Sequence, residues 1–234
     1  MEVMQRKLRY SDTLTFKLYH LCYYFSRVEG YDVDKQLILD FKNEEEVAIR
    51  QFILKALDFF GHGQMSDDLI VLRPLHSNET KIDSTLTPLD RLGDSMASVF
   101  NCTYYPGLLT KSRATKQVKT LSPAMRKAEL REVYKIETTY FDFNKKPVLI
   151  IDDIVTTGAT VCAIIATILK DFPNAKINVF SLAWTPTPDQ QLYIQRQSKV
   201  NNYLNEPEVP YGLKSTNTID KDFENGQTYV SIFP

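Results

Sequence analysis

Two adjacent carboxylates stand directly after a short apolar run, where a ligand could reach them. The run covers residues 148–151, and Asp152 and Asp153 follow it. Such a run predicts a buried strand, whose successive side chains point to opposite faces, so at least one carboxylate must face a crevice. Ligands of open parallel sheets bind at the carboxyl ends of the strands. The two acids are therefore candidates to accept hydrogen bonds from ligand hydroxyl groups.

The residues after the two acids have the composition of an anion-binding turn. Thr156, Thr157 and Thr160 carry hydroxyl groups, and Gly158 and Ala159 lie between them, ahead of a predicted helix. Gly158 permits close approach of the backbone, and the first amides of a helix attract anions. Acceptors for hydroxyl groups beside donors for a phosphate match a ribose 5-phosphate. The alternative is a helix-capping turn after an ordinary strand; neither a P-loop nor a complete dinucleotide fingerprint occurs in the chain.

Apolar runs that alternate with amphipathic stretches predict the elements that position this turn. Strands are predicted at 69–72, 148–151 and 177–184, and a helix follows the turn as far as Leu169. We expect further helices from an Asn43 cap to Gly61 and from a Thr87 cap, which has Asp90 at the capping-box distance. Their predicted buried stripes are Val47, Phe52, Ile53, Ala56, Leu57 and Phe60, and Leu89, Leu92, Met96 and Val99. This order predicts an α/β fold: an open, mostly parallel sheet with helices on both faces.

The composition indicates the class of protein but does not identify a ligand. The 234 residues are 43% hydrophobic and 24% charged, as in an ordinary globular protein with a substantial core. Lys plus Arg total 28 against 29 for Asp plus Glu, so net charge gives no argument for nucleic acid. The three cysteines are far apart in the sequence, which favours reduced thiols and no zinc site. Because neither a secretory signal nor a membrane-length apolar run is visible, we expect a cytoplasmic protein that does not enter a membrane.

One segment of the chain is strongly basic. Residues 110–135 contain eight basic and two acidic residues. A solvated face is the ordinary reason for such a run, and a patch that binds nucleic acid is another. Residues 1–40 are rich in aromatic side chains, and their pattern leaves strand and helix open.

Residues 148–160 resemble the 5-phosphoribosyl 1-diphosphate (PRPP) motif of type I phosphoribosyltransferases, with four apolar residues, two acids and Thr-Thr-Gly-x-Thr. The basic segment is similar to one in ComF-type (amidophosphoribosyltransferase-like) proteins, and residues 36–57 are similar to the helical approach to the sheet in that family. In the basic segment five residues recur at the family's spacing: Arg113, Thr115, Gln117, Leu121 and Arg126. The resemblance implies a type I phosphoribosyltransferase-like domain over residues 1–184, in which 1–40 would form a hood or N-terminal extension. Residues 185–234 would be a C-terminal extension.

The resemblance also implies an activity and a role for each residue. PRPP with Mg²⁺ would bind, and its phosphoribosyl group would pass to an unidentified nitrogen acceptor with release of diphosphate. Asp152 and Asp153 would hold the ribose hydroxyls and orient Mg²⁺ through substrate or water. The 5-phosphate would lie in the turn formed by Thr156, Thr157, Gly158, Ala159 and Thr160. The basic segment would close over the diphosphate as a flexible loop, and four catalytic residues would face that group: Arg73, Arg113, Lys116 and Arg126.

Several alternatives stay open on the residues alone. The same site would serve a non-catalytic PRPP- or nucleotide-binding regulator that acts through a protein or nucleic-acid partner. A homo-oligomer or a protein partner is expected in either case. Arg73 could instead be a packing residue at the surface, and His76, three residues later, could be a base or an ordinary loop histidine.

Overall fold

A computed structural model describes residues 4–11, 14–25, 32–62, 66, 68–82, 87–116, 121–137, 142–192 and 194. The chain divides into two units. The first contains all described residues up to Thr185, and the described residues from Pro186 onward belong to the second. In the second unit the Thr187 amide donates to the Gln190 side chain at 2.9 Å. The candidate site lies wholly within the first unit.

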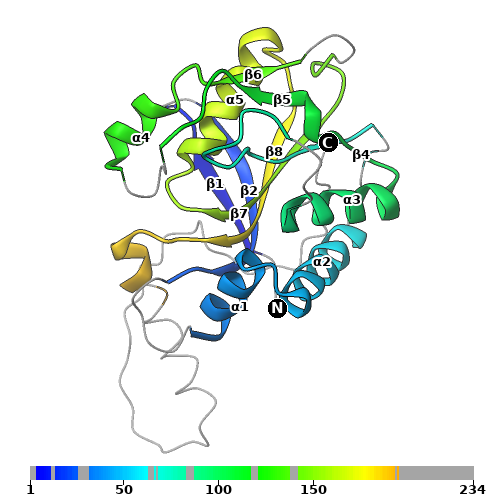
Figure 1. The fold of residues 1–234 in the computed structure, drawn as a ribbon, viewed down its shortest axis with the longest axis vertical. Helices are drawn as coiled ribbons and strands as arrows, with labels where there is room; N and C mark the ends of the chain where they lie inside the picture. The colour runs from blue at the N-terminus through cyan, green and yellow to red at the C-terminus, as the bar shows by residue number, and fades with distance from the viewer. Residues whose placement is uncertain are drawn as a thin grey trace, which may run out of the picture. The chain divides into compact units, whose positions relative to one another are not determined.

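A six-stranded sheet organises the first unit (Figure 1). Its spatial order is β1-β2-β8-β7-β3-β4, and every neighbouring pair is parallel except the antiparallel pair β1–β2. The strands are β1 (Met4–Arg9), β2 (Thr15–Tyr23), β3 (Ile70–Leu72), β4 (Thr103–Tyr104), β7 (Val148–Val155) and β8 (Ile177–Trp184). A smaller antiparallel pair joins β5 (Leu109–Lys111) to β6 (Tyr134–Ile136). The strand that carries the two acids, β7, continues past them to Val155 and lies inside the sheet, between β8 and β3.

Helices cover both faces of this sheet, as the sequence predicts. Leu149 and Ile151 of β7 pack in one core with α1 (Asp32–Lys42), α2 (Glu46–Gly61) and α3 (Pro88–Phe100). Val148 and Ile150 point the other way, into a second core with α5 (Ala159–Asp171). In Figure 1, α1, α2 and α3 lie below β5, β6, α4 (Pro123–Glu129) and α5 in the view. A short 3-10 turn, η1 (Pro106–Leu108), precedes β5. Because β7 is buried on both faces, its apolar residues are continuous rather than alternating.

Local signals place several elements correctly. Strand β8 covers the predicted residues 177–184, and β3 lies within the predicted 69–72. Helix α3 begins after Thr87, whose side chain accepts from the Asp90 amide while Asp90 caps the Thr87 amide in return. Helix α5 follows the threonine-rich turn and ends at Asp171, shortly before Pro173. Caps, prolines and apolar runs act within a few residues, so the sequence alone reveals them.

Other expectations are wrong or incomplete. Residues 4–9 and 15–23 form strands, which their mixed pattern left open. The N-cap of α2 is Glu45 rather than Asn43, because α1 ends at Lys42 and the chain turns at Glu44 with φ of 63°. Two residues assigned to buried stripes are exposed, Val47 at 69% and Val99 at 58%. The other predicted residues of both stripes are buried or half-buried, and Ala48 and Ile49, rather than Val47, are buried at the start of α2.

Candidate functional site

A cavity of about 490 Å³ lies at the carboxyl end of β7. Residues 152–161 line it without interruption, so the two acids and the whole threonine-rich turn share one space. Five other parts of the chain complete the walls: the residue after β2, the end of α1, the loop after β3, the start of α3, and the basic segment with β6. The residues from those parts are Tyr24, Leu39, Lys42, Pro74, Leu75, His76, Ser77, Leu89, Lys111, Thr115, Arg126, Leu130 and Tyr134. The sheet thus brings a carboxylate pair, an amide-rich turn and several cationic side chains to one cavity.

The two carboxylates of the cavity have different surroundings. Asp152 is half-buried, and its Oδ1 accepts from the Asp153 amide at 2.9 Å. Burial, followed by the nearby Asp153 carboxylate, raises the pKa of Asp152 well above its usual value. The Asp153 carboxylate instead pairs with the Lys42 ammonium at the end of α1. Ionisation of Asp152 is thus disfavoured, while the charge of Asp153 is paired with Lys42 of α1, a residue that the sequence analysis did not assign to the site.

The turn after the acids leaves backbone amides available at the start of α5. Gly158 is the N-cap of this helix, and no side chain caps the first amides. Its φ of +72° lies in the left-handed region that glycine tolerates best. A Cβ on Gly158 would stand 2.5 Å from Leu8 Cδ1, so β1 packs directly against the turn. Uncapped amides at a helix N-terminus can bind an anionic group, and the residues that carry them here line the cavity together with Asp152 and Asp153.

Arg73 does not face the cavity, contrary to the sequence-based expectation. Its side chain is fully buried, with Nε 2.6 Å from Asp90 Oδ1 and Nη1 2.9 Å from Glu79 Oε2. Burial opposes its charge, but the hydrogen bonds from Arg73 to Glu79 and Asp90 more than compensate and raise the pKa of Arg73. Tyr104 also donates to Asp90. Arg73 is therefore a buried structural cation that holds the loop after β3 to α3, and it has no surface toward a ligand.

The other three basic residues expected at a diphosphate lie in different places. Arg113 is exposed and pairs with Glu129 at 2.6 Å, and the Lys116 side chain is exposed. Neither residue lines the cavity. Arg126, on α4, does line it, and its Nη1 lies 3.5 Å from Thr156 Oγ1 in the turn. Residues 117–120 of the expected flexible loop, including Gln117, lie outside the described residues.

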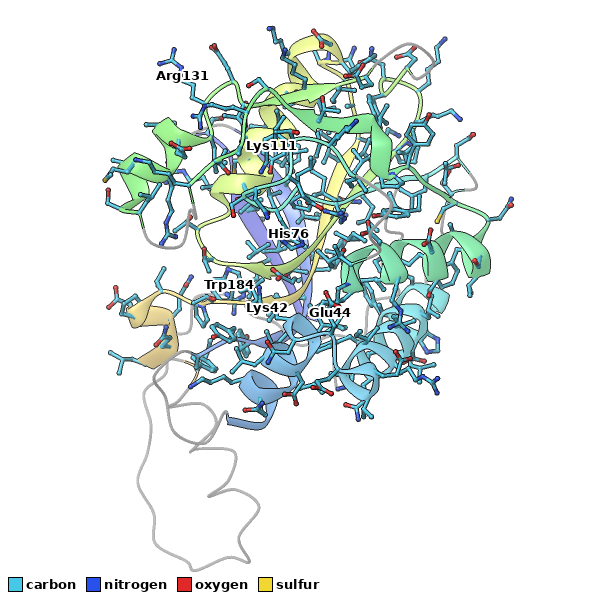
Figure 2. All side chains as sticks on the ribbon, viewed as in Figure 1. Lys42, Glu44, His76, Lys111, Arg131 and Trp184 are labelled. Atoms are coloured by element: carbon cyan, nitrogen blue, oxygen red, sulfur yellow. The ribbon has the colours of Figure 1, made fainter. Side chains whose placement is uncertain are left out.

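Three residues line the cavity that the sequence analysis did not assign to the site. Lys42 lies at the end of α1, Lys111 at the end of β5, and His76 in the loop after β3; Figure 2 shows them one below another in the view, with Lys111 uppermost. Lys111 is one of eight basic residues in its segment, and nothing in their order distinguishes it. Its burial depends on the pairing of β5 with β6, which the sequence pattern did not predict.

The described residues contain no group of three or more His, Cys, Asp or Glu side chains placed to hold a metal ion. In the same part of the chain, no helix combines the length and the apolar character needed to cross a membrane.

Comparisons with known proteins give little further guidance. No protein-family model and no curated protein sequence matches the chain. Among solved structures, the chain is similar to adenine phosphoribosyltransferase from Trypanosoma brucei, in a complex with AMP, pyrophosphate and ribose-5-phosphate. The match has 13% identity and a TM-score of 0.40, over 71% of this chain and 83% of the other. A likeness at this level does not establish a function, so the geometry of the cavity has to indicate one.

Proposed function

We propose that the protein binds PRPP with Mg²⁺ and transfers its phosphoribosyl group to a nitrogen acceptor with release of diphosphate. One observation carries this proposal. The carboxylate pair, the uncapped amides of α5 and the cation Arg126 all line a single cavity at the carboxyl end of a parallel strand. This set offers acceptors for ribose hydroxyls, donors for a phosphate and a cation for a further anionic group.

The chain would act mainly by positioning the substrate and stabilising its charge. Asp152 and Asp153 would accept from the ribose hydroxyls, so Lys42 would have to share or release Asp153. The amides and hydroxyls from Thr156 to Thr160 would surround the 5-phosphate. Mg²⁺ binds through one or two carboxylates together with substrate phosphates, and the cavity's pair of acids suits an ion that arrives with the substrate. Such an ion would neutralise charge on the diphosphate.

The binding step is tested by thermal unfolding with PRPP and Mg²⁺. Ligand at a hundred times its Kd should stabilise the protein by roughly 2.7 kcal/mol, which raises Tm. Asp152→Asn combined with Asp153→Asn should abolish this shift. Burial already disfavours the charge of Asp152, so its replacement by a neutral isostere should leave the fold intact. Asp171→Asn, at the exposed end of α5, is the matched control. A full response from the double variant would show that these acids do not hold the ribose.

A second candidate is a PRPP- or nucleotide-binding regulator without transfer activity. The position of the basic residues favours it, because Arg126 is the only one of the four expected at the diphosphate that lines the cavity in the described residues. Diphosphate release in the presence of a panel of nitrogen bases separates the two functions. Release that depends on one base supports transfer, whereas tight PRPP binding without release from any base supports the regulator.

A further inference from the structure

A lysine from a distant helix is paired with one of the two acids of the cavity. Lys42 is the last residue of α1, and its ammonium contacts Asp153 Oδ2, 111 positions away in the chain. Both residues line the cavity, and Figure 2 shows Lys42 where α1 ends, below His76 in the view. The Lys42 side chain is 40% exposed, so a ligand in the cavity can reach it. The ion pair therefore belongs to the candidate site, and a ligand has to accommodate it.

Asp153 has a partner on each of its carboxylate oxygens. Oδ1 accepts from the Ile154 amide at 2.5 Å, and Oδ2 is paired with Lys42. The amide fixes the direction of the carboxylate, and the ammonium supplies its counter-charge. A divalent cation that approached Oδ2 would meet the ammonium at the same oxygen, and like charges repel each other. Asp153 is thus a carboxylate that already holds a cation.

The place of Lys42 in its helix does not explain this pair. Basic side chains are favourable in the last turn of a helix, and α5 also has one there, Lys170. Lys170 is exposed and does not line the cavity, whereas Lys42 is directed to a carboxylate of the central strand β7. A partly exposed ion pair contributes little to stability. Neither the helix nor the stability of the fold therefore accounts for a lysine at Asp153, and its position in the cavity points to a role toward the ligand.

An ammonium beside a carboxylate suits a hydroxyl group of a ligand. Lys42 Nζ has three hydrogens to donate, and its contact with Asp153 uses one of them. A ligand hydroxyl can accept from the ammonium while it donates to the carboxylate. A divalent cation at an acid would serve in the same two ways, because it neutralises the carboxylate and attracts the hydroxyl oxygen. Here a side chain of the protein offers both.

We propose that Lys42 is a resident cation of the acid pair, which with Asp153 binds a ribose hydroxyl group without a metal ion at Asp153. The proposal rests on the proposed function, in which the two acids hold the ribose. It specifies that Lys42 shares Asp153 with the ligand and is not released. Asp152 is then the carboxylate that remains for Mg²⁺ brought in by the substrate. Two consequences follow: ribose 5-phosphate binds independently of metal, and the acid pair alone is a poor site for a divalent cation.

Calorimetric titration of the full chain with ribose 5-phosphate, in EDTA and in Mg²⁺, tests the first consequence. The wild-type protein should bind with the same affinity in both buffers. Lys42→Met should bind roughly 10- to 100-fold more weakly in EDTA, as expected for the loss of one charged hydrogen bond. Mg²⁺ should restore affinity to this variant, because the ion can then reach Asp153. Lys42→Arg keeps the cation and should behave as the wild type, and Lys170→Met, the matched control in the last turn of α5, should change nothing.

Titration with Mn²⁺ alone, followed by electron paramagnetic resonance, tests the second consequence without any sugar. Lys42→Met should bind Mn²⁺ roughly tenfold or more tightly than the wild type, because the ammonium no longer repels the ion. Asp152→Asn and Asp153→Asn, added to Lys42→Met, should remove this gain and so assign it to the acid pair. Lys170→Met should bind Mn²⁺ as the wild type does.

Equal affinities for Mn²⁺ in the wild type and in Lys42→Met overturn the proposal. Unchanged binding of ribose 5-phosphate to Lys42→Met in EDTA overturns it as well. A loss of affinity that Mg²⁺ does not reduce would show that the lysine and a metal ion are not interchangeable, which is equally contrary to the proposal. If ribose 5-phosphate fails to bind the wild type in either buffer, the proposed function fails, whereas the Mn²⁺ titrations still decide whether Lys42 holds the cation position.

Discussion

Gly158→Ala should destabilise the fold in addition to weakening ligand binding. Gly158 has a φ of +72°, and an added Cβ would lie 2.5 Å from Leu8 Cδ1. A residue with a Cβ in the left-handed region costs roughly 1–2 kcal/mol. Leu8 is buried at 7% exposure, so moving its methyl group away should add about 1–2 kcal/mol of overpacking. The expected loss in the free energy of unfolding is therefore about 2–4 kcal/mol.

Urea unfolding of four proteins separates the two causes: wild type, Gly158→Ala, Leu8→Ala and the double variant. Leu8→Ala alone should cost about 2–5 kcal/mol, because it leaves a cavity in the core. In that background Gly158→Ala should cost only the backbone part, about 1–2 kcal/mol, because the methyl group in its way is gone. An equal cost of Gly158→Ala in both backgrounds would refute the reasoning that β1 packs against the turn. A negligible cost in both would also refute the backbone argument.

Three further predictions concern the turn and the buried ion cluster. Thr160→Val should weaken ribose 5-phosphate binding by roughly 1.5–3 kcal/mol in calorimetry, with little change in Tm, because it deletes one hydroxyl donor at the cavity; unchanged affinity would place the phosphate elsewhere. Arg73→Met should cost about 3–5 kcal/mol in urea unfolding, because Asp90 and Glu79 lose their buried partner; in a variant that still folds, an undiminished affinity for diphosphate would confirm that Arg73 does not touch the ligand. Burial opposes ionisation of Asp90, but hydrogen bonds from Arg73, Tyr104 and Thr87 outweigh burial and lower the pKa of Asp90. The Asp90 carboxylate therefore stabilises the fold fully above the ordinary carboxyl pKa, and this contribution is lost as pH falls through the lowered pKa of the folded state. Asp90→Asn should therefore flatten the decline of unfolding free energy in acid, and an unaltered pH profile would contradict this.

Sequence information determined the parts of this protein that depend on near neighbours in the chain. The apolar run before Asp152 predicts β7, and the Thr87–Asp90 capping box predicts the start of α3. The threonine-rich turn and the helix after it follow from the same local rules, because caps and turns use hydrogen bonds between residues a few positions apart. The α/β class follows as well, since alternating strands and helices favour a parallel sheet.

Tertiary structure alone decided which charged side chains reach the cavity. Arg73 follows a buried strand just as a ligand-binding arginine would, yet Asp90 and Glu79 hold its guanidinium in the interior. Lys111 is one of several similar lysines in the sequence, and its burial at the cavity depends on the pairing of β5 with β6. Leu8 reaches Gly158 across 150 residues because β1 pairs with β2 at the edge of the sheet. Such contacts join segments far apart in the chain, so neither propensity nor spacing encodes them, and the direction of a long charged side chain depends on which partner the fold brings within reach.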